Sequence, residues 1–149
     1  MGLTMFKMTL LLFLFSNLLL ASAYTPELNA LISKAKTQVD GVTPEEATLM
    51  VKDGAILIDV RDSNEWDMSS LNTEGEVIKI SRGLIEFEYV VKILSKHNKD
   101  DVYIVFCGHG PRAIFVALRM KELGFTNVTY LDGGMKSWVE KGFIVDEAF

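Results

Sequence analysis

The single cysteine of this chain, Cys107, lies where the residue types suit an anionic sulfur nucleophile. In VYIVFCGHGPRAIFVAL, a run of β-branched and aromatic residues ends at Cys107, and five loop residues follow: Gly108, His109, Gly110, Pro111 and Arg112. Glycines allow backbone angles at which successive N–H groups point toward one bound anion. The positive end of the helix dipole, at the start of the following helix, stabilises an anion at the same place. These groups favour a thiolate, which is the nucleophilic form of cysteine. We therefore expect Cys107 to be catalytic, with Arg112 holding the loop or binding an oxyanion.

A purely structural interpretation of the same loop is a buried cysteine at a strand end, followed by an ordinary turn. Packing alone does not require two glycines and an arginine in this register. The anion site is therefore the favoured interpretation, with the loop residues Gly108 to Pro111 contacting the substrate.

The elements that must position this loop alternate along the chain. Apolar runs predict buried strands at 55–60, 77–80, 101–107 and 127–132. Helical spacing and capping residues predict helices within 26–39, 43–54, 83–97, 112–125 and 133–143. Such alternation predicts an α/β domain with a parallel sheet and helices on both faces. Ligands bind beyond the carboxyl ends of such strands, so Cys107 is expected at the functional edge.

Two of the predicted helices carry specific signals. In 43–54, Thr43 is the expected N-cap, Pro44 occupies the first helical position, and two glutamates follow. In 83–97, apolar residues recur at helical spacing: Leu84, Phe87, Val91 and Leu94.

Composition limits the function classes. The 149 residues suffice for about one domain, and 49% of them are hydrophobic. The net charge is −5 and no basic block occurs, so a nucleic-acid partner is not expected. No pair of cysteines or histidines has metal-ligand spacing, so neither a metal nor another cofactor is expected.

The N-terminal stretch KMTLLLFLFSNLLLASA has the order of parts of a secretory signal. A lysine precedes an apolar core, and Ala21-Ser22-Ala23 provides an A-x-A cleavage site. The apolar run is shorter than the roughly 20 residues that span a membrane. We therefore expect residues 1–23 to be removed, no membrane insertion after cleavage, and a periplasmic or secreted protein. A helical segment, residues 24–42, would then precede the main domain.

Three motifs occur in an order that resembles the rhodanese (sulfurtransferase) family. CGHGPR matches its loop pattern C-x-x-G-x-R, ILIDVRDSNEW is similar to its D-V-R-x-x-x-E-[WY] stretch, and YLDGGMKSWVEKGFIV is similar to its C-terminal motif. The resemblance implies a rhodanese fold over residues 43–147, with a five-stranded parallel sheet. It also implies a sulfurtransferase in which Cys107 carries a persulfide. Sulfane sulfur would pass from a small anion such as thiosulfate to a thiophilic acceptor, such as a thiol protein.

The same motifs leave two alternatives open. The loop from Cys107 to Arg112 has the six-residue size of the sulfurtransferases, whereas related phosphatases carry one residue more, so a phosphatase or arsenate reductase is disfavoured. A non-catalytic module that binds an anion or a partner is the other alternative. MSSLNTEGEVIKI departs from the family pattern, and Gly108 stands where many thiosulfate users have Arg or Lys.

Charged residues outside the loop are expected to support it. We expect Asp59 to accept hydrogen bonds from loop backbone and Arg61 to pair with Glu65. Arg82 precedes a helix and is expected to line the substrate pocket. The Gly133-Gly134 pair and Trp138 are interpreted as turn and packing residues.

Overall fold

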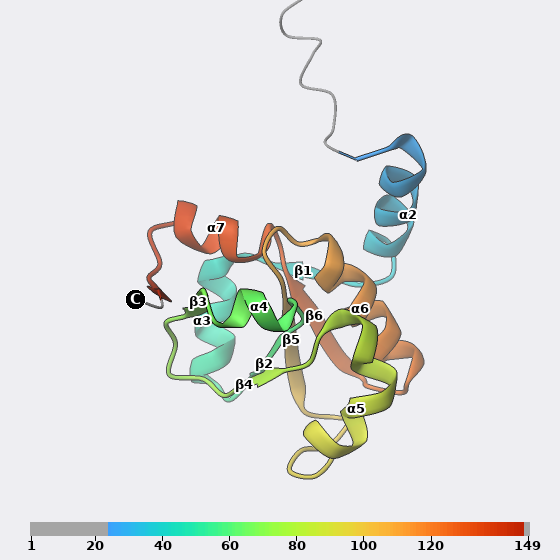
Figure 1. Ribbon diagram of the computed structural model, residues 1–149. Helices are drawn as coiled ribbons and strands as arrows, with labels where there is room; N and C mark the ends of the chain where they lie inside the picture. The colour runs from blue at the N-terminus through green and yellow to red at the C-terminus, as the bar shows by residue number, and fades with distance from the viewer. Residues whose placement is uncertain (1–23, 148–149) are drawn as a thin grey trace, which may run out of the picture. The chain divides into compact units, whose positions relative to one another are not determined.

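A five-stranded parallel sheet organises the domain in the computed structural model, which describes residues 24–147 (Figure 1). The strand order is β1-β6-β5-β2-β4, and all four neighbouring pairs are parallel. The strands are β1 (Gly41–Val42), β2 (Ile56–Asp59), β4 (Val77–Lys79), β5 (Val102–Phe106) and β6 (Asn127–Leu131). The predicted parallel α/β architecture is therefore confirmed, and β5, which leads into Cys107, lies at the centre of the sheet.

The chain divides into two units after Ala30, within helix α2 (Pro26–Lys36). The unit from Leu31 onward contains the sheet and the candidate active site. The expected signal sequence, residues 1–23, lies outside the described residues. Within 24–147, no helix combines the length and the apolar character needed to cross a membrane.

Helices cover both faces of the sheet because its central strands are apolar on both sides. Ile58 and Val105 belong to the core shared with α5 (Ile85–Lys92) and α6 (Pro111–Glu122). Leu57 and Ile104 face the opposite way, into the core shared with α3 (Pro44–Lys52) and α7 (Gly134–Glu140) (Figure 1). Successive strand residues point to opposite faces, which explains this division.

Helix α3 begins as its sequence predicts. The Thr43 hydroxyl accepts the backbone N–H of Glu46, and the Glu46 carboxylate accepts the N–H of Thr43 at 2.8 Å. This capping box satisfies two of the otherwise unpaired groups at the helix start.

Helix α5 is rotated so that much of its apolar face lies in solvent. The spacing of Phe87 and Val91 correctly indicated a helix, but these side chains are 78% and 73% exposed. A short 3-10 turn, η1 (Arg82–Leu84), precedes the helix, and Ile85 and Ile93 make its buried contacts.

The segment 24–42 is not helical to its end, because β1 at Gly41–Val42 pairs with β6 and belongs to the sheet. Three further short elements were not predicted: α4 (Ser63–Trp66), β3 (Ser69–Leu71) and β7 (Val145–Glu147). β3 and β7 form a separate two-stranded antiparallel ribbon in which Ser70 opposes Asp146. The segment that departs from the family pattern therefore pairs with the C-terminal end of the described chain. A pairing between strands 74 or more residues apart leaves no local signal in such short stretches.

Candidate active site

The Cys107 loop joins the end of β5 to the start of α6. The cysteine is buried, with 1% of its surface exposed, and its Sγ accepts the backbone N–H of Gly110 at 3.1 Å. Gly110 has φ 109°, a conformation that side chains rarely adopt, and Pro111 opens the helix at its first position. The glycine therefore allows the turn that aims an N–H group at the sulfur.

The start of α7 holds the other side of this loop. The N–H of Met135 donates to the carbonyl of Cys107 at 2.9 Å, and that of Lys136 donates to the carbonyl of Gly108 at 3.0 Å. Gly134 has φ 61°, and a Cβ built there would collide with the Cys107 carbonyl oxygen and lie 2.8 Å from the Gly108 carbonyl carbon. Gly134 thus permits a close approach of two backbones, and this contact is with the catalytic loop, which the interpretation as a turn and packing residue did not specify.

Arg112 is held by a carboxylate from α4. Its two terminal nitrogens contact the two carboxylate oxygens of Glu65 at 2.5 and 2.8 Å, and Asp62 lies 3.6 Å from one of them. Hydrogen bonds from Arg112 lower the pKa of Glu65 from its usual 4.5 to about 2. This bidentate pair ties the first turn of α6 to the segment after β2.

Arg61 does not form the ion pair that was expected with the Glu65 carboxylate. Its guanidinium instead binds Asp59, with an Nη2–Oδ2 distance of 2.7 Å, and both residues are buried. It also donates to the backbone carbonyls of Glu65 and Ser69. Glu65 is unavailable because Arg112 occupies its carboxylate. Asp59 also accepts a backbone hydrogen bond, from the N–H of Arg61 at 3.1 Å. The Asp59–Arg61 pair therefore stabilises the end of β2.

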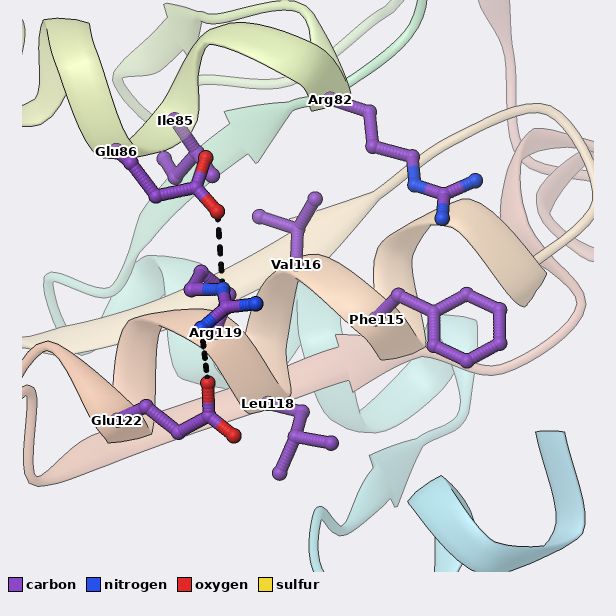
Figure 2. Close-up of a pocket in the computed structure, with 8 residues that line it drawn as sticks. All are labelled: Arg82, Ile85, Glu86, Phe115, Val116, Leu118, Arg119 and Glu122. Atoms are coloured by element: carbon purple, nitrogen blue, oxygen red, sulfur yellow. Dashed lines mark hydrogen bonds and ion pairs between the residues drawn. The ribbon is translucent and has the colours of Figure 1, made fainter. Parts of the chain in front are cut away.

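Arg82 lies beside the site without joining the loop. Its guanidinium sits over the Phe115 ring, 5.1 Å from the centroid, as Figure 2 shows. Arg82 and Arg112 line a common open cavity together with Phe87 and the start of α4. The separate cavity of Figure 2 contains Arg119 bound to both Glu86 and Glu122, and no residue of the Cys107 loop lines it.

Glu65 lines a second open groove, which Arg112 does not line. Gly108 and His109 of the loop line it, together with residues of α7 and of the β3–β7 ribbon. His109 is exposed, whereas Cys107 is buried. Among residues 24–147, no group of three His, Cys, Asp or Glu side chains is arranged to hold a metal ion.

Replacing Glu65 by glutamine is expected to reduce the acid sensitivity of the fold. Because the folded-state pKa of Glu65 is lowered to about 2, its pairing stabilises the protein fully above pH 4.5, and this contribution disappears as pH falls toward 2. Solvent screening of the partly exposed pair limits the contribution to about 1 kcal/mol. Urea unfolding of wild type and Glu65→Gln should differ at pH 7, and the difference should shrink below pH 4.5 and disappear once the pH falls below about 2. Glu122→Gln, at an exposed pair with Arg119, is the control, and an equal difference at both pH values would contradict the role of the charge.

Comparisons with known proteins agree with this architecture. The family model described as "Rhodanese-like domain" matches residues 43–141. Thiosulfate sulfurtransferase GlpE of Haemophilus influenzae (strain PittEE) is 30% identical over 108 residues, which cover 72% of this chain and 95% of that protein. Among solved structures, the 30 kDa polysulfide-sulfur transferase homodimer of Wolinella succinogenes is similar with a TM-score of 0.68 and 26% identity, covering 80% of this chain and 87% of that one. The human single-domain sulfurtransferase TSTD1 shares the fold, with a TM-score of 0.57 and 23% identity over 69% of this chain and 97% of that one.

Proposed function

The chain belongs to the rhodanese-like domain family, and on that premise we propose that it is a sulfurtransferase that carries sulfane sulfur on Cys107. The observation that supports this most directly is the loop itself. Cys107 follows the central strand, its sulfur accepts the N–H of Gly110, and its carbonyl is fixed by α7. A sulfur anion at this position is therefore stabilised by a donor that is already in place.

In the proposed reaction, the Cys107 thiolate attacks the outer sulfur of a donor such as thiosulfate. A new S–S bond forms on Cys107, the donor's S–S bond breaks, and its electron pair leaves with sulfite. The resulting persulfide passes its outer sulfur to cyanide or to a thiol, which is either a small molecule or a protein, and the Cys107 thiolate returns. Covalent catalysis thus divides one transfer into two easier steps.

Intact-mass measurement before and after incubation with thiosulfate or mercaptopyruvate tests this proposal. We expect the protein to gain the mass of one sulfur atom, and to lose it when cyanide or a thiol is added. A protein that gains no sulfur from any donor would instead be a module that binds an anion or a partner without turnover.

We also propose that the mature protein begins near Tyr24 and is periplasmic or secreted. The proposal rests on the lysine, the apolar core and the A-x-A site within residues 1–23. The mass of the protein recovered from an exported fraction decides it, because a product that keeps Met1 would contradict cleavage.

A further inference from the structure

An apolar stripe lies on the solvent-facing side of η1 and α5. Its residues recur at intervals of three and four positions, which places them on one face over two helical turns, about 10 Å along the axis. We call the following four residues the α5 stripe: Leu84, Phe87, Val90 and Val91, which are 44%, 78%, 54% and 73% exposed. Ile85 and Ile93 already anchor the helix to the core, so its packing does not depend on the stripe. A contiguous exposed apolar surface of this kind marks an interaction site.

The α5 stripe borders the reacting loop. Phe87 lines an open cavity together with Arg82 and with Arg112, the last residue of the Cys107 loop. No residue of the stripe lines the separate groove beside Gly108. A partner that covers the stripe therefore also fills the Phe87 cavity and meets the end of the loop that carries the nucleophile.

One positive charge at this cavity has no carboxylate partner. Arg112 is bound by Glu65, and Glu86 binds Arg119 at 2.9 Å. Arg82 is exposed, its guanidinium lies over an aromatic ring (Figure 2), and it forms no ion pair within residues 24–147. The surface that complements this region is therefore apolar over the stripe and carries one carboxylate opposite Arg82.

A protein provides this complement better than a small anion or a lipid surface does. A small anion contacts Arg82 alone and leaves the stripe in water. Anionic membranes are bound by clusters of Lys and Arg, whereas Asp62 and Glu86 line the cavity and the net charge of the chain is −5. A second helix, in contrast, packs its side chains between those of the stripe and holds a carboxylate at one fixed position.

We propose that the α5 stripe and Arg82 form the docking surface for a protein that accepts sulfur from Cys107, and that this acceptor packs an amphipathic helix with one carboxylate against them. The inference rests on the proposed function and names the class of acceptor. In the transfer, the acceptor's thiolate forms a bond to the outer sulfur of the Cys107 persulfide. The bond between that sulfur and Sγ breaks, its electron pair stays on Cys107 as the thiolate, and the acceptor leaves as a persulfide. No oxidant or reductant is needed for this step.

Sulfur transfer from the persulfide form to synthetic helical peptides tests the proposal. Each peptide carries one cysteine. The first has leucines along one face and a glutamate one turn from the cysteine, and the second has glutamines in place of the leucines. We expect the second-order rate constant to be about tenfold higher for the first peptide, because its leucines remove the stripe from water. This preference should fall toward one in the double variant Phe87→Gln, Val91→Thr.

Two controls accompany this measurement. Transfer to mercaptoethanol, which is too small to cover the stripe, should be unchanged in Phe87→Gln, Val91→Thr. The matched variant is Leu49→Gln, Val102→Thr, which introduces the same two polar side chains at exposed sites on α3 and β5. It should keep the wild-type preference between the peptides.

A third peptide, with glutamine in place of the glutamate only, isolates the role of Arg82. We expect this change to lower the rate constant about threefold in the wild-type protein, the size typical of an exposed ion pair. In Arg82→Gln the two peptides should react equally fast. A charge effect of the same size in both proteins would show that the carboxylate does not bind Arg82.

Binding of serine versions of the peptides to Cys107→Ser protein, measured by fluorescence anisotropy, gives a readout that does not depend on transfer. The first peptide should bind about tenfold tighter than the second, with the difference lost when Phe87→Gln and Val91→Thr are added. Equal binding of the two peptides, or a preference that survives these substitutions, would overturn the proposal. Stripe-dependent binding to vesicles of phosphatidylcholine and phosphatidylglycerol, in place of the peptides, would overturn it in favour of a lipid surface. Absence of transfer to every thiol, with the difference in peptide binding intact, would instead refute the sulfurtransferase function and leave the docking surface standing.

Discussion

Cys107→Ser is expected to abolish sulfur transfer, lowering the rate by at least about 10⁴-fold, while the protein stays folded. A serine hydroxyl cannot carry the persulfide, and it is a far weaker nucleophile than a thiolate at neutral pH. The fold should survive because the two side chains differ little in volume, and the hydroxyl oxygen can accept the N–H that Gly110 donates to the sulfur at 3.1 Å.

Sulfite release from thiosulfate and intact mass together measure this effect. The variant should release no sulfite and gain no sulfur, and its thermal unfolding should remain cooperative. Because Cys107 is the only cysteine in the sequence, no other thiol can replace it. Full sulfur transfer by Cys107→Ser would show that the persulfide mechanism is wrong.

Gly134→Ala is expected to destabilise the protein by roughly 2–4 kcal/mol and to displace the active-site loop. The added Cβ would collide with the carbonyl oxygen of Cys107 and lie 2.8 Å from the backbone nitrogen of His109. The start of α7 and the Cys107 loop cannot move apart without breaking the hydrogen bonds that Met135 and Lys136 donate to the loop. The melting temperature should fall on the order of 10 °C, and sulfur transfer should fall with it at temperatures where the variant is still folded.

Gly142→Ala is the matched control for this substitution. Gly142 also has a positive φ, 82°, but a Cβ there meets no atom within 4 Å. Gly142→Ala should therefore lower the free energy of unfolding only by the backbone strain, about 1 kcal/mol, and leave sulfur transfer unchanged. If both variants lost the same stability and activity, the collision with the Cys107 loop would not be the cause.

The amino-acid sequence alone determined the central strands and the longer helices, and which strand leads into the chemistry. Apolar runs such as ILI in β2 and VYIVF in β5 favour burial on both faces, and helices between such strands favour parallel pairing. The position of Cys107 at the carboxyl end of a strand follows from this order. The capping box at Thr43 is equally local, because its two partners are three residues apart.

Only the tertiary structure decided which side chains meet. Arg61 has one carboxylate two residues before it, Asp59, and another four residues after it, Glu65. The spacing does not predict that Arg61 binds Asp59. Nor does it predict that Glu65 binds Arg112, which lies 47 residues further along the chain. The same holds for the approach of Gly134 to the Cys107 carbonyl and for the exposure of Phe87 on α5. Periodicity specifies a face of a helix, but the rotation of that helix against the sheet depends on all its packing partners at once, and these lie far away along the chain.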